Sequence, residues 1–280
     1  MNCTADNSIN RHYNIRSFAL ALLLGELALT ALAAPRAAVQ PTGVRNSSGP
    51  QRLNEKQLQQ AQESLRHKSG LVELGFDEQG ALVLGNRQHI RGGSATARAL
   101  LIAAVDSRNL YELESHERSP EVAFARIYES EDRLIAETGQ RLTIYQVQID
   151  FADFSRLSGA REAKAAFDIG IALLHELVHG VLKLPDPQSA DQIGDCDAHV
   201  NQMRRELQLP ERLYYQPGIT VVRSSDGRGI VCARLEFVER QAGQAEPSAK
   251  YQLTWLPSQV SPNAQNIAGL QQGLLASKRR

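Results

Sequence analysis

The stretch DIGIALLHELVHGVLKL, residues 168–184, contains the pattern that decides the fold of this chain. It has no proline, and uncharged residues flank both histidines of His175-Glu176-Leu177-Val178-His179, so it indicates a helix buried in a core. Two histidines four residues apart lie on one face of a helix, about 6 Å apart along its axis. Both imidazoles can therefore reach one zinc ion, to which histidine nitrogens bind at roughly 2.0–2.1 Å.

Glu176 follows the first histidine, where a carboxylate can meet a metal-bound water and accept its proton. The alternative interpretation is a core helix with two incidental histidines. Two histidines and a glutamate are costly in a core unless they are paired or bind a metal. The pattern therefore favours one zinc ion per chain, with His175 and His179 as ligands.

The segment Ala172–Val181 resembles the active-site helix of the zincin metallopeptidases. The consensus of that helix begins with a small or β-branched residue and two uncharged residues, followed by His-Glu. Two uncharged residues, a second His, an uncharged residue and a hydrophobic residue complete it. The resemblance covers roughly the middle third of the chain. It implies that His175 and His179 are zinc ligands and that Glu176 is the catalytic base. It also implies an α+β fold, in which a small twisted sheet packs on helices that include the metal helix.

A third protein ligand is expected, because a catalytic zinc normally has three and keeps an open position for water. It should come from the helix that the pattern predicts after the metal helix. Asp195, which begins that helix after a glycine, is favoured, and His199 and Asp197 are alternatives. The other interpretations are a helix N-cap for Asp195 and a partner of the ligand for His199. Cys196 is a minor option, since a thiolate with two histidines also suits zinc.

A second, weaker resemblance covers the same helix. In a group of bacterial secreted or effector-type zincins, an acidic residue opens a helix that carries Asn and Arg and precedes a Leu-Pro-x-Arg stretch. The corresponding residues here are Asn201, Arg204, Arg205 and Leu209-Pro210-Glu211-Arg212. This resemblance adds support to Asp195 as the third ligand.

The expected function is that of a secreted zinc metallopeptidase whose partner is a peptide or protein substrate. Tyr214 or Tyr215 is a candidate electrophile for the oxyanion, and the alternative is that both are half-buried packing residues. Two alternatives remain open. The protein could be a zincin-like domain that binds zinc or a partner without turnover, or a zinc amidase that acts on cell-wall material. An intact Glu176 favours the peptidase, because a binding module needs no base.

The N-terminus has the pattern of a secretory signal peptide. Arg11 and Arg16 precede the apolar run Phe18–Ala34, and Ala31-Leu32-Ala33 fits a cleavage site between small residues. Cleavage near Ala33 predicts a secreted or periplasmic protein without stable membrane association. The alternative is an uncleaved anchor in the membrane.

The composition suits one globular domain. The chain has 280 residues, 42% of them hydrophobic, and equal numbers of acidic and basic residues, 31 of each. The balanced charge gives no indication of nucleic-acid binding or of an anionic membrane surface. We expect a signal peptide at 1–33, a linker at 34–50, one domain at 51–257 and a poorly ordered tail at 258–280.

Loss of Cys3 with the signal peptide leaves two cysteines, Cys196 and Cys232. In an oxidising compartment two cysteines predict one disulfide, and the alternative is two separate buried thiols.

The remaining secondary structure follows from periodicity and turn residues. Helices are predicted at 53–68, capped by Asn54 and ended by Gly70, and at 95–105 after Gly92-Gly93-Ser94. Two hairpins are expected, one formed by strands 71–76 and 81–84 and the other by strands 219–223 and 230–238. Further strands are expected at 111–115, 122–128, 142–151 and 251–256.

Overall fold

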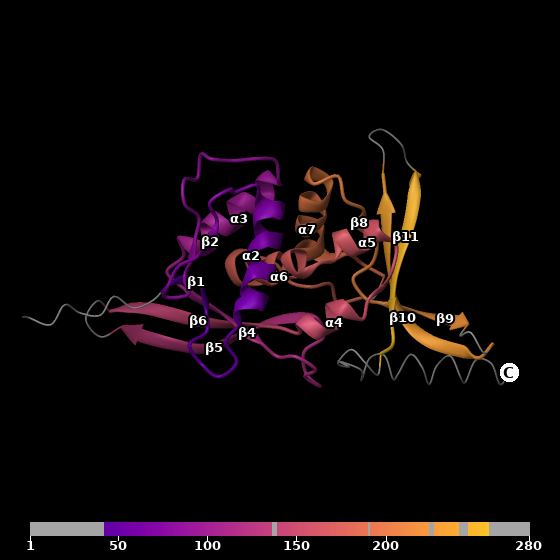
Figure 1. Cartoon of the computed structure of the whole chain (residues 1–280), viewed down its shortest axis with the longest axis horizontal. Helices are drawn as coiled ribbons and strands as arrows, with labels where there is room; N and C mark the ends of the chain where they lie inside the picture. Colours follow the sequence, from indigo (N-terminus) through magenta and orange to yellow (C-terminus); the bar gives the residue numbers. More distant parts are fainter. Residues whose placement is uncertain (1–41, 136–138, 190, 224–226, 241–245, 258–280) are drawn as a thin grey trace, which may run out of the picture. The chain divides into compact units, whose positions relative to one another are not determined.

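The computed structural model describes residues 42–135, 139–189, 191–223, 227–240 and 246–257 (Figure 1). The fold is α+β, with small sheets packed on helices, as the sequence predicts. The expected signal peptide at 1–33 and the expected tail at 258–280 lie outside the described residues.

The first sheet has four strands in the order β1-β4-β6-β5. Strands β1 (Gly43–Asn46), β4 (Leu110–Ser115) and β6 (Gln140–Ile149) are parallel, and β5 (Ala125–Ile135) pairs antiparallel with β6. Strand β5 is therefore an edge strand of this sheet.

Strand β1 corrects the predicted linker at 34–50. Gly43 pairs with Leu110 in a parallel ladder, and Val44 is buried. The backbone of Gly43 has a φ of +77°, and an added Cβ would lie 2.7 Å from the carbonyl oxygen of Val105. Gly43, which contributes to the linker-like composition, is thus needed because the strand passes close to α3 at this residue. The sequence does not predict β1, because a strand with one buried side chain has no detectable alternation of apolar and polar residues.

Helices α2 (Glu55–Ser69), α3 (Ala95–Val105), α6 (Ile169–Leu177) and α7 (Gly194–Glu206) lie together on one side of this sheet (Figure 1). Asn54 caps α2 through a capping box with Gln57, and Gly70 ends it in the left-handed conformation, as predicted. Helix α6 contacts α2, α3 and α7 as well as β5 and β6. The metal helix of the sequence analysis is therefore the central element of the core.

Two features hold the ends of this central helix. At its start, Asp168 accepts a hydrogen bond from the backbone N–H of Ile171, and the buried Lys68 of α2 pairs with the Asp168 carboxylate at 2.8 Å. At its end, α6 widens into the π-helix η1 (Val178–Leu182), and Lys183 leaves it with a φ of +57°. A π-helical turn is a distortion found often at functional sites. Together the π-turn and the left-handed residue reverse the chain.

The stretch Arg161–Leu182 passes a length and apolarity test for a membrane-spanning helix, but most of it is buried inside this fold. It comprises α5 (Arg161–Ala166), α6 and η1, and the helix is interrupted at Phe167. It is the centre of the core rather than a surface for lipid.

The second sheet is antiparallel and is built mainly from the C-terminal part of the chain. Strand β10 (Gly229–Glu239) pairs with β9 (Gly218–Arg223), β8 (Glu211–Arg212) and β11 (Ala249–Trp255), and β11 pairs with the short β7 (Ser158–Gly159). The predicted C-terminal hairpin is confirmed as β9 and β10. The hairpin at 71–84 is also confirmed, with the shorter strands β2 (Gly75–Phe76) and β3 (Leu82–Val83). Helix α4 (Phe151–Ser155) occupies residues where the sequence predicts the end of a strand.

The predicted disulfide is wrong, because Cys196 and Cys232 are both buried and free. Cys232 lies in β10 opposite Thr220, whereas Cys196 contacts His175 of α6. Each cysteine is a buried apolar residue in the core of its own element. The sequence shows two cysteines but does not show that they belong to different parts of the core.

We predict that Gly180→Ala destabilises the fold by about 1–3 kcal/mol, the usual cost of overpacking a core. An added Cβ would lie 2.7 Å from Tyr111 Cε1 and 2.9 Å from Ile127 Cδ1. Denaturant unfolding would measure the loss. Gly75→Ala is the control, since its nearest atoms lie 3.4 Å away. An equal loss in the two variants would contradict the role of the close packing beneath η1.

Candidate metal centre

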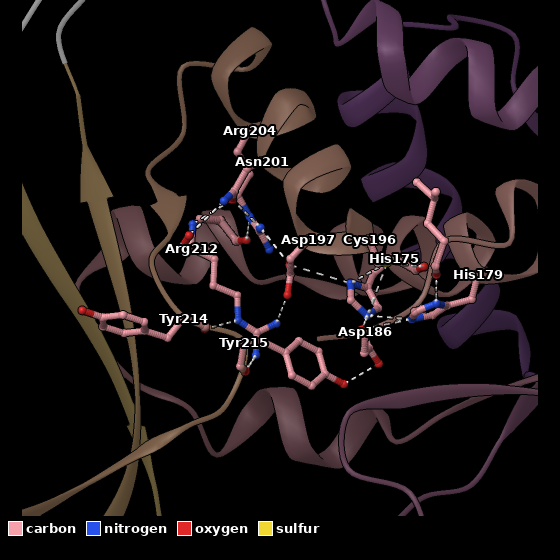
Figure 2. Close-up of polar contacts among 12 residues, drawn as sticks. His175, His179, Asp186, Cys196, Asp197, Asn201, Arg204, Arg212, Tyr214 and Tyr215 are labelled. Carbon is pink, nitrogen blue, oxygen red and sulfur yellow. Dashed lines mark hydrogen bonds and ion pairs between the residues drawn. The ribbon is translucent and has the colours of Figure 1, made fainter. Parts of the chain in front are cut away.

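His175 and His179 point their rings at one place, as the sequence predicts (Figure 2). Their Nε2 atoms are 3.1 Å apart, and the two rings are nearly perpendicular, at 84°. His175 stands in the last turn of α6 and His179 in η1. The π-turn does not disturb their approach, because it begins between them and both side chains stay on one face.

The third group facing this place is Asp186. Its Oδ1 atom lies 3.4 Å from His175 Nε2 and 3.3 Å from His179 Nε2. That oxygen is buried and has no hydrogen-bond partner, while Oδ2 accepts a hydrogen bond from the Tyr215 hydroxyl at 2.6 Å. Three atoms bound tetrahedrally to one zinc at roughly 2.0–2.1 Å would be about 3.3–3.4 Å apart. The two nitrogens and the oxygen therefore fit three corners of a metal-binding tetrahedron.

The chain brings Asp186 back to the histidines through the turn that ends η1. Lys183 takes the left-handed conformation, and prolines stand on both sides of the aspartate. The sequence analysis treats Pro185-Asp186-Pro187 only as a helix stop. The sequence does contain a pattern that could have indicated Asp186 as a ligand. Asp186 is an acidic residue between two prolines, and it follows directly after a helix with two candidate ligands.

The residues favoured as third ligand occupy other positions. In the described part of the chain the donor atoms that gather within 4.8 Å of one another belong to His175, His179, Asp186 and Cys196. Asp195 is exposed in the first turn of α7, and His199 is part-buried on that helix and outside the group. We therefore put Asp186 in the place that the sequence analysis gave to Asp195.

Cys196 lies beside His175 and is the fourth member of the donor group. Its Sγ atom is 3.5 Å from His175 Nδ1 and 3.8 Å from Nε2. Burial and the nearby Asp197 carboxylate raise the pKa of this thiol. The raised pKa disfavours the thiolate that would bind a metal.

Asp197, another of the candidate ligands, is a fully buried partner of two arginines. Its carboxylate pairs with Arg204 at 3.3 Å and with Arg212 at 3.1 Å, and its Oδ1 lies 3.8 Å from His175 Nδ1. Burial would raise the pKa of Asp197, but Arg212 and Arg204 outweigh it and hold that pKa below its ordinary value. Asp197 is therefore a fixed negative charge behind the histidine.

Hydrogen bonds around the site orient the candidate ligands. The Nδ1 atom of His179 bonds to the carbonyl oxygen of Leu184 at 2.6 Å, which leaves Nε2 free to bind a metal. Tyr215 donates to Asp186, and its ring stacks on His175 at 6.2 Å and 14°. Arg212 holds Tyr215 in turn, by donating to its carbonyl oxygen.

Tyr214 and Tyr215, the two candidate electrophiles, differ in orientation. Figure 2 shows the Tyr215 ring directed at Asp186 and the Tyr214 ring directed away from the histidines. Tyr214 is 42% exposed. Burial and the bond to Asp186 raise the pKa of Tyr215, so its hydroxyl stays a hydrogen-bond donor.

Glu176 is buried and faces the same cavity as the ligand group. Burial raises the pKa of Glu176, while the imidazoles of His175 and His179 act in the opposite direction. Ile127 of β5 lines the same cavity as Glu176. The glutamate of the metal helix thus shares the cavity with the edge strand of the first sheet.

The electrostatics of the ligand group favour a bound cation. Burial would raise the pKa of Asp186, but His175, His179 and Tyr215 outweigh it and lower that pKa. Burial would lower the pKa of His179, and Asp186 and Glu176 outweigh it in turn. The carboxylates therefore favour a positive charge at His179, and a metal cation would supply one there.

A cavity of about 770 Å³ opens beside the ligands. The start of β5 and the segment before it line one side, and residues of the second sheet line the other. The cavity wall has an exposed part and a buried part. Partly or fully exposed residues of the wall include Glu121, Ala123, Arg126, Ile127, Arg212, Gln216 and Pro217. Buried residues of the wall include Phe124, Phe167, Ala172, Leu235 and Trp255.

No family model, curated protein or solved structure matches this chain. The assignment of the site therefore depends on its geometry and on the chemistry of its residues.

We predict that Asp186→Ala abolishes stoichiometric metal binding, because it removes the only unpartnered buried carboxylate oxygen that the described residues direct at both histidines. Metal content after dialysis would be measured by elemental analysis. Asp195→Ala is the matched control and should keep the full metal content. If Asp195→Ala loses the metal and Asp186→Ala retains it, the ligand assignment is wrong.

We predict that Tyr215→Phe weakens metal affinity roughly 10–100-fold, the usual effect of removing a hydrogen bond to a ligand. The substitution keeps the ring that stacks on His175 and removes only the donor to Asp186. A competition titration with a chromogenic chelator would give the dissociation constants. Tyr214→Phe should leave affinity unchanged, and equal affinities in all three proteins would refute a role for the Tyr215 hydroxyl.

Proposed function

We propose that this protein is a zinc-dependent metallopeptidase of the zincin type. The observation that carries the proposal is the triangle of His175 Nε2, His179 Nε2 and Asp186 Oδ1, with edges of 3.1–3.4 Å, beside the buried Glu176. A set of two histidines and one carboxylate, with one position left open, is typical of catalytic zinc sites.

The residues of the site suit hydrolysis of an amide bond. A zinc ion in such a site supplies a Lewis acid and lowers the pKa of a bound water towards ~7. Glu176 would accept a proton from that water and pass it to the nitrogen of the leaving amine. Its raised pKa, caused by burial, brings its proton affinity closer to neutral pH, which suits a group that must both take and give a proton.

The position of β5 supports a peptide substrate. Ala125, Arg126 and Ile127, at the start of this edge strand, line the cavity next to Glu176. An edge strand offers unpaired backbone groups to an extended peptide, which adds to the sheet as another strand. A peptide held along β5 would carry its backbone past the ligand group.

Tyr215 has a positioning role in this proposal. Its hydroxyl hydrogen-bonds to Asp186 at 2.6 Å, and it therefore holds the carboxylate with Oδ1 turned to the histidines. The sequence analysis offered Tyr214 or Tyr215 as the electrophile that stabilises the oxyanion. We assign neither of them that role, because Tyr215 is engaged with Asp186 and Tyr214 is directed away (Figure 2).

The two alternative functions differ from a peptidase in what they require. A domain that only binds zinc or a partner needs no carboxylate beside the ligands, whereas Glu176 follows His175 directly and lines the same cavity. A cell-wall amidase would need a site for sugars, and the buried part of this cavity is walled by apolar side chains. Export of the protein is part of the proposal and follows from the pattern at 1–33 alone.

We predict that Glu176→Gln keeps the metal and the fold but lowers peptide hydrolysis by ~10² or more, the scale of a lost general base. Casein and a quenched fluorescent peptide library would serve as substrates. Glu63→Gln, an exposed change on α2, is the control for the chemical substitution. Equal activity in wild type and Glu176→Gln would mean that the glutamate is structural. Absence of hydrolysis by zinc-loaded wild type would overturn the proposal.

A further inference from the structure

The buried part of the cavity has an aromatic wall. Phe124, Phe167 and Trp255 line it together with Leu235 and Ala172, and all five are buried apart from what they show to the cavity. They come from five separate parts of the chain: the segment before β5, the link between α5 and α6, α6 itself, strand β10 and strand β11. Here "aromatic wall" means Phe124, Phe167 and Trp255.

Phe124 is the centre of this wall. Its ring makes edge-to-face contacts with Phe167 at 5.0 Å and with Trp255 at 5.3 Å. A further ring, Phe154, packs against Phe124 at 5.4 Å but does not line the cavity. The wall is therefore backed by a second layer and keeps its shape when the cavity is filled.

The backbone of Phe124 adds an independent sign that this ring is placed for a purpose. Its φ is +64°, a left-handed conformation that is strained for a bulky residue. Two buried aspartates fix it: Asp153 Oδ2 accepts from the Phe124 N–H at 3.1 Å, and the Asp150 N–H donates to the Phe124 carbonyl at 2.9 Å. Strain held in this way is common where a side chain must be presented to a ligand.

The wall lies directly beside the catalytic group. Ala172 is one helical turn before Glu176 on α6, so both project from the same face of the helix. A side chain in the apolar part of the cavity would therefore sit next to the bond that Glu176 and the ligands act on. A small residue at position 172 leaves that space open.

Two arginines of the cavity wall, Arg204 and Arg212, are already paired. Arg204 donates to the Ala166 carbonyl, to Asp197 and to Asn201, and Arg212 donates to Asp197 and to two carbonyl oxygens. Asp197 is in turn held by both arginines. An acidic side chain of a substrate would therefore lose its hydration without gaining either arginine as a free partner.

We propose that this apolar part of the cavity is the selectivity pocket of the enzyme and takes a large apolar side chain, aromatic by preference, of the substrate residue next to the cleaved bond. The inference rests on the proposed function and names the substrate class for it. An aromatic ring gains both from apolar burial and from edge-to-face contact with the wall.

Trp255 provides a direct probe, because it is the only tryptophan in the chain and belongs to the wall. The zinc-loaded Glu176→Gln protein would be titrated with blocked peptides that share one sequence and differ at one residue: Phe, Leu, Ala or Asp. We expect the Phe peptide to change Trp255 fluorescence and to bind at least tenfold tighter than the Ala or Asp peptide. Equal affinities with no change in fluorescence would overturn the pocket.

Cleavage kinetics give a second measurement on proteins that retain Glu176. Ala172→Leu fills the pocket from the metal helix, and we expect it to lower the ratio of kcat/KM for Phe over Ala peptides at least tenfold, with zinc content unchanged. Phe167→Leu removes one ring and serves if the filled variant does not fold. Ala198→Leu, at an exposed position of α7, is the matched control.

The outcomes separate the two proposals. Cleavage of all peptides without preference, or a preference that neither variant changes, would overturn the pocket and leave the peptidase proposal standing. A Trp255 response to the Phe peptide with no cleavage of any peptide by wild type would overturn the peptidase proposal and leave a pocket for apolar side chains. Preference for Phe that falls in Ala172→Leu and not in Ala198→Leu supports both.

Discussion

The constraint on which this structure depends is the cost of a buried carboxylate oxygen without a partner. Asp186 satisfies Oδ2 through Tyr215 and leaves Oδ1 against two imidazole nitrogens. A desolvated oxygen of this kind costs several kcal/mol unless a cation or a donor meets it. The three residues line the cavity, so a cation can reach the place between them and meet Oδ1. The geometry is stable when a cation occupies the place that the three residues surround.

Burial also gives a local chain of hydrogen bonds and ion pairs that leads from α7 to Asp186. Asp197 on α7 holds Arg212 of β8, Arg212 holds the backbone of Tyr215, and Tyr215 holds Asp186. Each link is a hydrogen bond or an ion pair between groups that are largely out of water, where such bonds are stronger and their loss is more costly. Through this chain the helix after the metal helix controls the third candidate ligand, although it does not supply it.

The sequence predicts the local parts of this site and misses the part that depends on a turn. The histidine pair and Glu176 follow from spacing on one helix, and the caps of α2 follow from Asn54 and Gly70. Asp186 does not, because its approach requires the π-turn and the left-handed Lys183, which no periodicity encodes. Asp195 and Asp186 are both acids near the metal helix in the sequence, and only the path of the backbone distinguishes them.

The same limit explains the errors in the fold. The α+β class and most strands follow from alternation and turn residues, whereas β1 is a strand with one buried side chain in a segment that has the composition of a linker. The disulfide was predicted from a count of cysteines, which carries no information on distance. Contacts between elements far apart in the chain decided each of these cases.

The order of the elements along the chain has a consequence for how the protein is made. The donors for a metal lie within residues 175–186, but the aromatic wall includes Trp255 of β11, near the end of the described chain. A ribosome that has released the metal helix has yet to release the sheet that forms the far side of the cavity. Domains fold as units once their chain is available. A nascent or truncated chain that stops before β10 thus contains the three candidate ligands but lacks Leu235 and Trp255, so the cavity beside the ligands is incomplete.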